Sequence, residues 1–119
     1  MKVKVSPSQV AGSVAIPSSK SLAHRAIICA SLAQGTSTVS NITYSKDIDA
    51  TIACMEALGA RIKKQETSCI ITGTNVKNRT EPVSMDCNES GSTLRFLIPL
   101  CALSNQKATL IGHGRLMQR

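Results

Sequence analysis

The sequence predicts an α/β fold assembled from βαβαββ units, with a mixed sheet that carries its helices on one face. Three observations support this fold class. Apolar residues repeat at strand spacing in some segments and at helix spacing in others. A succession of strand, serine- or glycine-containing turn, helix and strand occurs twice, about 70 residues apart, as in duplicated supersecondary units. The composition, 42% hydrophobic and 18% charged, is typical of a globular chain.

Two strands and a helix are predicted at the start of the chain. Val3 and Val5 alternate with lysines and indicate a short edge strand, and Gly12–Pro17 indicates a second strand. Apolar residues at helical spacing then predict a helix that extends to about Gln34, where the following Gly35 is a typical helix stop.

A strand, a second helix and a hairpin complete the first unit, which is predicted over about residues 12–74. Thr36–Ile42 alternates as a strand does. Asp47 stands near the N-cap of the second helix, whose apolar residues follow at helical spacing. Two strand-like segments at 60–66 and 69–73, joined by a short turn, then predict the hairpin.

The second unit is predicted to begin at about residue 82 and to be incomplete. A strand is expected over 83–86, a helix over 91–104 with a kink at Pro99, and a strand over 108–111. Because the sequence stops at Arg119 before the remaining elements of this unit, we expect the chain to be a fragment of a longer protein.

The charge of the chain favours anionic partners. Fourteen basic and seven acidic residues give a formal net charge of +7. The cations are scattered beside glycine and serine and form no continuous block, which suits a small anionic ligand better than a polyanion. Only 2% of the residues are aromatic, which argues against single-stranded nucleic-acid binding because that binding relies on stacking platforms.

The five cysteines show no CxxC spacing and therefore predict neither a zinc nor a redox site. Cys29, Cys54 and Cys101 lie in apolar periodic segments, and we expect them to be small core residues in a reducing cytosol. Neither a signal-peptide pattern nor a membrane-length apolar run is seen in the sequence, so the expected location is the cytoplasm.

The segment around Lys20 is the strongest candidate for a binding site. Ser19, Lys20, Ser21 and Arg25 cluster at the predicted start of the first helix. A helix N-terminus offers free N–H groups and the positive end of the helix dipole, and hydroxyls and cations added there favour a phosphate or carboxylate. The alternative is an ordinary serine N-cap beside two solvated cations.

Three stretches extend this pattern: Ser19-Lys20-Ser21 with Arg25, then Glu89–Arg95, then Gly114–Arg119, with Asp47 between the first two. They resemble, in the same order, motifs of the 5-enolpyruvylshikimate-3-phosphate (EPSP) synthase family, the 3-phosphoshikimate 1-carboxyvinyltransferases. The resemblance covers nearly the whole chain and favours the anion-site interpretation.

The resemblance implies a fold of six βαβαββ units in two lobes, of which residues 1–119 would be a partial N-terminal lobe. It implies transfer of the enolpyruvyl group of phosphoenolpyruvate to the 5-hydroxyl of shikimate 3-phosphate, with release of phosphate, in the shikimate pathway to chorismate and aromatic amino acids. It implies no metal, no organic cofactor and a monomeric full enzyme.

The resemblance also bears on the isolated chain. Because the C-terminal lobe would supply further substrate contacts, we expect the 119 residues alone to lack turnover. The family's extreme N-terminal strand belongs with that other lobe, so Met1 to about Ser18 would lack its partner. We also expect the edge of the unfinished sheet to permit self-association.

Roles for individual residues follow from the resemblance. Lys20 and Asp47 would be catalytic, although Asp47 could equally be a simple N-cap. The residues implied in shikimate 3-phosphate binding are Lys20, Ser21 and Arg25, and those implied in phosphoenolpyruvate binding are Lys20, Gly91 and Arg115. Further candidate contacts are Ser90, Ser92, Glu89 and Arg119.

Two positions depart from the family pattern. Glu89 stands where many members have asparagine, and its carboxylate would repel phosphoenolpyruvate unless a cation pairs with it. Phe96 stands where many members have proline. Among the neighbours of the motifs, Arg95 is either structural or ligand-facing, and His24 and His113 are predicted to be exposed.

Two other functions are compatible with the sequence. A UDP-N-acetylglucosamine enolpyruvyl transferase would share the fold, but it has Lys-Asn where this chain has Lys20-Ser21 and lacks the Arg25 spacing. A basic RNA- or ribosome-binding module could use similar βαβαββ units, although the lack of stacking aromatics and of a basic stripe counts against it. We therefore expect neither nucleic acid nor membrane as a partner.

Overall fold

The computed structural model describes residues 1–118 and confirms the mixed α/β fold class. Within those residues it contains three α-helices, two small sheets and two short 3-10 helices. The elements are, in chain order, α1 (Lys20–Leu32), β1 (Thr36–Ser40), α2 (Lys46–Ala57), β2 (Arg61–Lys64), β3 (Ser68–Thr72), η1 (Val76–Asn78), β4 (Val83–Asp86), α3 (Gly91–Ala102), β5 (Ala108–Ile111) and η2 (Gly114–Gln118).

The strands pair in two separate sheets. In the first sheet β3 is central and pairs antiparallel with β1 and β2, so the predicted hairpin is confirmed. In the second sheet β4 and β5 pair parallel, with Val83 opposite Ala108 and Asp86 opposite Ile111. The predicted repeat is present only in part: α1–β1 and α3–β5 share the helix–strand order, but the first copy lacks its leading strand, and β1 pairs antiparallel whereas β5 pairs parallel.

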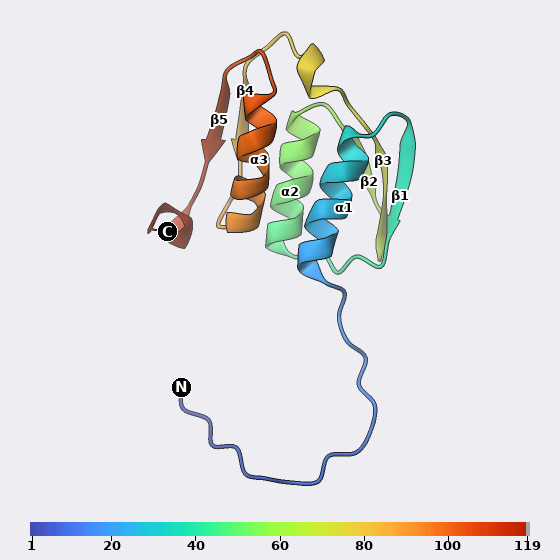
Figure 1. The fold of residues 1–119 in the computed structure, drawn as a ribbon, viewed down its shortest axis with the longest axis vertical. Coiled ribbons are helices and arrows are strands. Elements are labelled where there is room, and N and C mark those ends of the chain that lie inside the picture. The colour runs from blue at the N-terminus through green and yellow to red at the C-terminus, as the bar shows by residue number, and fades with distance from the viewer. Residues whose placement is uncertain (119) are drawn as a thin grey trace.

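The three helices lie side by side in the order α3, α2, α1, with β4 and β5 on the α3 side, β1, β2 and β3 on the α1 side, and the N-terminal ends of the helices at the same lower edge (Figure 1). Each helix begins after a serine N-cap, at Ser19, Ser45 and Ser90, whose hydroxyl accepts a hydrogen bond from the N–H group three residues later. The cap of α2 is thus Ser45, and Asp47 lies in the first turn of that helix instead of at the cap.

The two strands predicted before α1 do not form. Residues 1–17 are exposed and contain neither helix nor strand. They extend away from the folded part of the chain as an unpaired segment (Figure 1). Val14 and Ile16 are 84% and 85% exposed. A strand needs a partner for its N–H and C=O groups, and no strand within residues 1–118 pairs with this segment. Ser18, which shares two hydrogen bonds with Thr43, is where the chain joins the folded part.

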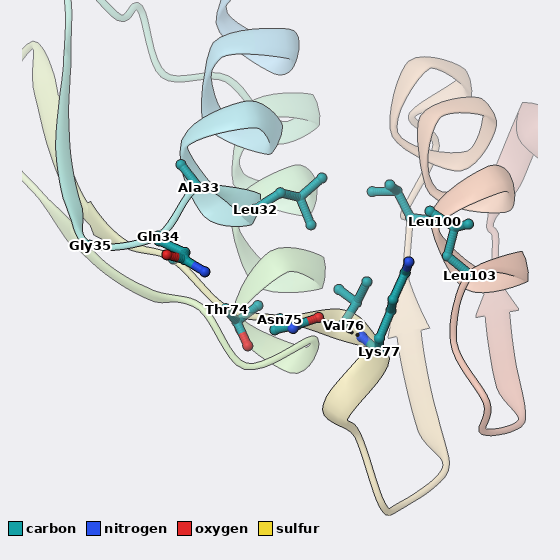
Figure 2. Close-up of a pocket in the computed structure, with 11 residues that line it drawn as sticks. Leu32, Ala33, Gln34, Gly35, Thr74, Asn75, Val76, Lys77, Leu100 and Leu103 are labelled. Atoms are coloured by element: carbon teal, nitrogen blue, oxygen red, sulfur yellow. Dashed lines mark hydrogen bonds between the residues drawn. The ribbon is translucent and has the colours of Figure 1, made fainter.

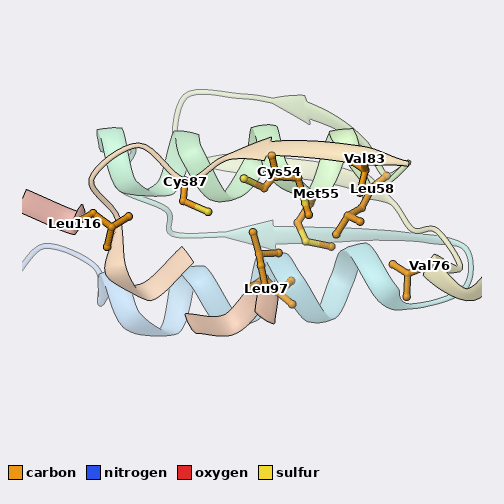
Figure 3. Packing of buried hydrophobic residues seen from close by; sticks show 11 residues of the cluster. Cys54, Met55, Leu58, Val76, Val83, Cys87, Leu97 and Leu116 are labelled. Carbon is orange, nitrogen blue, oxygen red and sulfur yellow. The ribbon is translucent and has the colours of Figure 1, made fainter. Parts of the chain in front are cut away.

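The core is organised around α2, which contributes to two apolar clusters. Ile48 and Ile52 pack with residues of α1 and of the three-stranded sheet. Cys54, Met55 and Leu58 pack with α3, β4 and the segments beside them (Figure 3). Full burial of each such aliphatic side chain contributes about 1.5–3 kcal/mol. The two clusters together hold α1 and α3 on either side of α2.

The burial predicted for three of the cysteines is observed only in part. Cys54 is buried, and burial raises the pKa of its thiol to about 12, so it remains protonated. Cys101 is half-buried, whereas the prediction for Cys29 is wrong because its side chain is on the exposed face of α1. Helical spacing alone does not distinguish a small residue at the edge of an apolar stripe from one inside it.

A close backbone contact fixes the connection between α1 and the first sheet. The N–H group of Thr74 donates to the carbonyl of Ser31, and that of Gly73 donates to the carbonyl of Gly35. A Cβ added to Gly73 would lie 1.8 Å from the carbonyl oxygen of Ala33. Glycine is therefore required where β3 passes the end of α1.

Replacing Gly73 by alanine is expected to destabilise the fold by about 2 kcal/mol or more, because backbone atoms must move to admit the methyl group. The melting temperature should fall by roughly 5–15 °C in thermal unfolding. Gly12→Ala is the control: an added Cβ there meets no described atom within 4 Å, and although the φ of Gly12 is +131°, its unpaired segment can change this angle without disturbing the fold. Equal melting temperatures for the two variants would contradict the close-contact account.

Candidate active site

A polar cavity of about 630 Å³ lies where the N-terminal ends of the helices meet. It receives residues from the first turns of α1, α2 and α3, from the turn before α3, and from η2. The lining residues are Lys20, Asp47, Glu89, Gly91, Ser92, Arg95 and Arg115. The structure therefore brings together six of the residues predicted from the sequence, with Arg95 as the seventh.

The cavity combines three cationic and two anionic side chains, a formal net charge of +1. The positive ends of the helix dipoles add to this field. An anion with several oxygen atoms would therefore be attracted to the cavity, whereas a cation would be repelled.

Lys20 and Asp47 form an ion pair across the first turns of α1 and α2, with 2.6 Å between Nζ and Oδ2. The two side chains are 55% and 33% exposed, so the pair adds little to stability. Its effect is geometric, because it directs the lysine ammonium into the cavity. An ammonium has three donors, and two of them remain for a ligand.

Gly91 and Ser92 start α3 beside this ion pair. Their position in the first turn leaves backbone N–H groups without partners in the helix, and Gly91 has no Cβ to block an approaching anion. Ser90, by contrast, does not line the cavity. Its side chain is 2% exposed and caps α3 through the N–H of Thr93.

The carboxyl end of Glu89 lies against Gly114, at the start of the loop that carries Arg115. Gly114 has a φ of +51°, and a Cβ added to it would lie 2.6 Å from the carboxyl group of Glu89. The glycine therefore lets η2 fold against Glu89, and Arg115 follows it into the cavity. Glu89 thus has a steric partner in this loop, which the sequence did not indicate.

Ser21 and Arg25 are not among the cavity residues. The guanidinium of Arg25 donates to the carbonyl oxygen of Ser21 at 3.0 Å and to its hydroxyl, and it stacks 5.0 Å from the ring centre of Phe96. The aromatic ring that departs from the family pattern is thus a cation–π partner for Arg25. Arg119, the remaining candidate contact, lies outside the described residues.

The prediction that His24 is exposed is wrong. Its side chain is fully buried, and its Nδ1 lies 2.7 Å from the hydroxyl of Thr51. Burial lowers the pKa of His24; Lys20 and Arg25 act in the same direction, and Asp47 opposes them. Helical spacing could have indicated the burial of His24, because this residue shares the buried face of α1 with Ile27 and Ser31. His113 is exposed as predicted, with its Nε2 2.9 Å from Asp86.

A second cavity, of about 540 Å³, lies at the opposite ends of the helices (Figure 2). Leu32 and Leu100 line it from the last turns of α1 and α3, and Lys77 extends into it from η1. Helix C-termini present carbonyl groups and the negative end of the dipole, which disfavours phosphate. The cavity at the N-terminal ends is therefore the better candidate for an anion site.

The described residues contain neither a membrane-spanning helix nor a metal-binding cluster. Among residues 1–118, no helix combines the length and the apolar character that crossing a bilayer requires. Within the same residues, no three histidine, cysteine, aspartate or glutamate side chains gather in positions suited to a metal ion.

The fold and the cavity together define an α/β protein with an anion site built from helix N-termini. A family model described as EPSP synthase (3-phosphoshikimate 1-carboxyvinyltransferase) matches residues 5–119. The 3-phosphoshikimate 1-carboxyvinyltransferase of Clostridium perfringens (strain SM101 / Type A) is 52% identical over 118 residues, and that of Clostridioides difficile (strain 630) is 46% identical over 126. The chain belongs to the EPSP synthase family.

The match covers nearly all of this chain but a minor part of each relative. The alignments span 99% of the chain and 28% of the C. perfringens protein, and 98% of the chain and 29% of the C. difficile protein. A solved EPSP synthase from Acinetobacter baumannii, 24% identical, superposes with a TM-score of 0.72 over 91% of this chain and 25% of that one. This structural likeness supports the fold.

The buried His24 should make stability depend on pH. Because its pKa in the folded chain is below the unfolded value of 6.5, the unfolded chain takes up the proton first. Stability should therefore fall as the pH decreases from about 6.5 toward the lower folded pKa. Urea unfolding between pH 7.5 and 5.5, in a His113→Asn background, should show this loss, and adding His24→Asn should reduce it. An unchanged slope in the double variant would contradict the assignment.

Proposed function

We propose that this chain forms part of the substrate site of a 3-phosphoshikimate 1-carboxyvinyltransferase. The complete enzyme would transfer the enolpyruvyl group of phosphoenolpyruvate to the 5-hydroxyl of shikimate 3-phosphate and release phosphate. The observation that carries the proposal is the convergence of Lys20, Gly91 and Arg115 on one cationic cavity in a chain of this family.

Both substrates carry phosphate and carboxylate groups, and the cavity offers a donor for each kind of contact. Arg115 can hold a phosphate through two parallel hydrogen bonds, and Lys20 acts as a point charge that two anions can share. The N–H groups at Gly91 and Ser92 provide uncharged donors at a helix start. Arg95, from the second turn of α3, is a further cationic donor of the same cavity.

Lys20 and Asp47 are the residues to which we assign a catalytic role. Negative charge moves onto the phosphate as it leaves, and a positioned ammonium stabilises that charge most where water is excluded. Asp47 keeps the ammonium of Lys20 in place through the 2.6 Å ion pair. The carboxylate also limits the net positive charge, so that release of the anionic products remains favourable.

Ser21 and Arg25 have a different position in this proposal. Neither residue lines the cavity; the Arg25 guanidinium donates to Ser21 and stacks on the ring of Phe96. For them to contact shikimate 3-phosphate, as the family resemblance implies, the ligand must extend beyond the residues that line the cavity. Their role in binding therefore stays a prediction.

The cavity is lined from one side by the described residues, and the chain spans about 28% of the length of its C. perfringens relative. We propose that a C-terminal lobe completes the site and that the 119 residues alone have no turnover. We further propose that the complete enzyme is a cytoplasmic monomer. Family membership argues against the RNA-binding alternative.

Replacing Lys20 by alanine should weaken the binding of shikimate 3-phosphate about 10- to 100-fold, because a charge-assisted hydrogen bond to the ligand is lost. Isothermal titration of the chain with shikimate 3-phosphate measures this change. Lys64→Ala is the matched control, since Lys64 forms an ion pair of the same length with Asp49 outside the cavity. The assignment is wrong if both variants bind as the unmodified chain does, or if both weaken equally.

A further inference from the structure

A chain of four buried polar side chains lies directly beneath the cavity. The His24 Nδ1 is 2.7 Å from the Thr51 hydroxyl, which is 2.7 Å from the Thr93 hydroxyl, which is 2.7 Å from the Ser90 hydroxyl. The first three side chains are fully buried and Ser90 is 2% exposed. These hydrogen bonds connect α1 to α2, and α2 to the start of α3.

The hydrogen bonds in this chain have one favoured direction. The other ring nitrogen of His24, Nε2, is buried and has no hydrogen-bond partner among residues 1–118. A buried N–H group without an acceptor costs more than an unprotonated ring nitrogen without a donor, so the proton belongs on Nδ1. His24 then donates to Thr51 and Thr51 to Thr93, and the single Thr93 hydroxyl proton is directed to Ser90 at 2.7 Å or to the Asp47 carbonyl at 3.3 Å. The Ser90 oxygen also accepts the N–H of Thr93 at 3.2 Å, which caps α3.

Each of the four hydrogen-bonded residues lies within one helical turn of a cavity residue. His24 is four residues after Lys20 on α1, and Thr51 is four residues after Asp47 on α2, so both lie one turn deeper on the same helix face. Ser90 and Thr93 flank the Gly91–Ser92 turn of α3. The Thr93 hydroxyl also lies 3.3 Å from the carbonyl oxygen of Asp47.

We propose that the His24–Thr51–Thr93–Ser90 chain is a positioning network that sets the spacing between the Lys20–Asp47 ion pair and the Gly91–Ser92 turn. Apolar packing tolerates small slides of one helix along another, whereas three 2.7 Å hydrogen bonds in a buried setting are all satisfied in one arrangement only. The consequence for ligand binding rests on the function proposed above, but the network itself rests on the distances and burial.

The test replaces the central hydroxyl. Thr51→Val keeps the shape of the side chain and removes the link between His24 and Thr93, and Thr51→Ser keeps the hydroxyl. Ser31→Ala is the matched control, because the Ser31 hydroxyl is equally buried in α1 but has no partner. All variants are made in the 119-residue chain.

Amide hydrogen exchange reports on positioning without any ligand. In Thr51→Val the Thr93 and Leu94 amides at the start of α3 should exchange about tenfold faster, while the Leu97 to Leu100 amides keep the rates of the unmodified chain. Thr51→Ser and Ser31→Ala should leave all of these rates unchanged. A uniform acceleration along α3, or none, would overturn the proposal, because a merely structural role predicts one or the other.

Affinity for shikimate 3-phosphate is the second readout. Thr51→Val should raise the dissociation constant about fivefold or more, and Ser31→Ala should not change it. Faster exchange at Thr93 with unchanged affinity would overturn the positioning role. If the unmodified chain does not bind shikimate 3-phosphate, these residues do not form a binding half-site on their own, and the exchange rates still decide whether the network fixes the start of α3.

Discussion

The packing of α2 between α1 and α3 is the constraint on which the rest of this structure depends. One side of α2 fills the cluster beneath the three-stranded sheet through Ile48 and Ile52, and the other fills the cluster around Leu97 through Met55 and Leu58. Because both sides are buried, α2 cannot rotate or slide without exposing apolar surface, which costs about 25 cal/mol for each Å². The two outer helices are thereby held parallel to it, with their N-termini at one end (Figure 1).

This parallel arrangement separates two chemistries at opposite ends of the molecule. The N-terminal ends contribute unpaired N–H groups, and the cations Lys20, Arg95 and Arg115 add charge of the same sign. The C-terminal ends contribute carbonyl groups and the apolar cavity lined by Leu32 and Leu100. The fold alone therefore makes this end the one that favours an anionic ligand, before any single contact is considered. The buried hydroxyls beneath that end then limit how far the helix starts can move apart.

Much of the fold and the cavity could be predicted from the sequence because their determinants are local. Helical spacing located all three helices, the repeat indicated the second helix–strand pair, and the motifs identified the cavity residues. Non-local determinants were missed. Residues 12–17 carry a strand pattern but have no partner strand, and Arg25 is directed to Phe96, far along the sequence. The burial of His24 depends on Thr51, which no local pattern connects to it. Sequence spacing shows which residues share a face, but it does not show what that face contacts.

If the three helix starts form a single anion site, one ligand must affect them together. Backbone amide chemical shifts of the chain, recorded during addition of shikimate 3-phosphate, test this directly. The amides of Lys20, Asp47, Gly91 and Ser92 should shift with one common dissociation constant, while those near Leu32 and Leu103 at the other end remain unchanged. Shifts confined to one helix start, or centred on the apolar cavity, would contradict the arrangement described above.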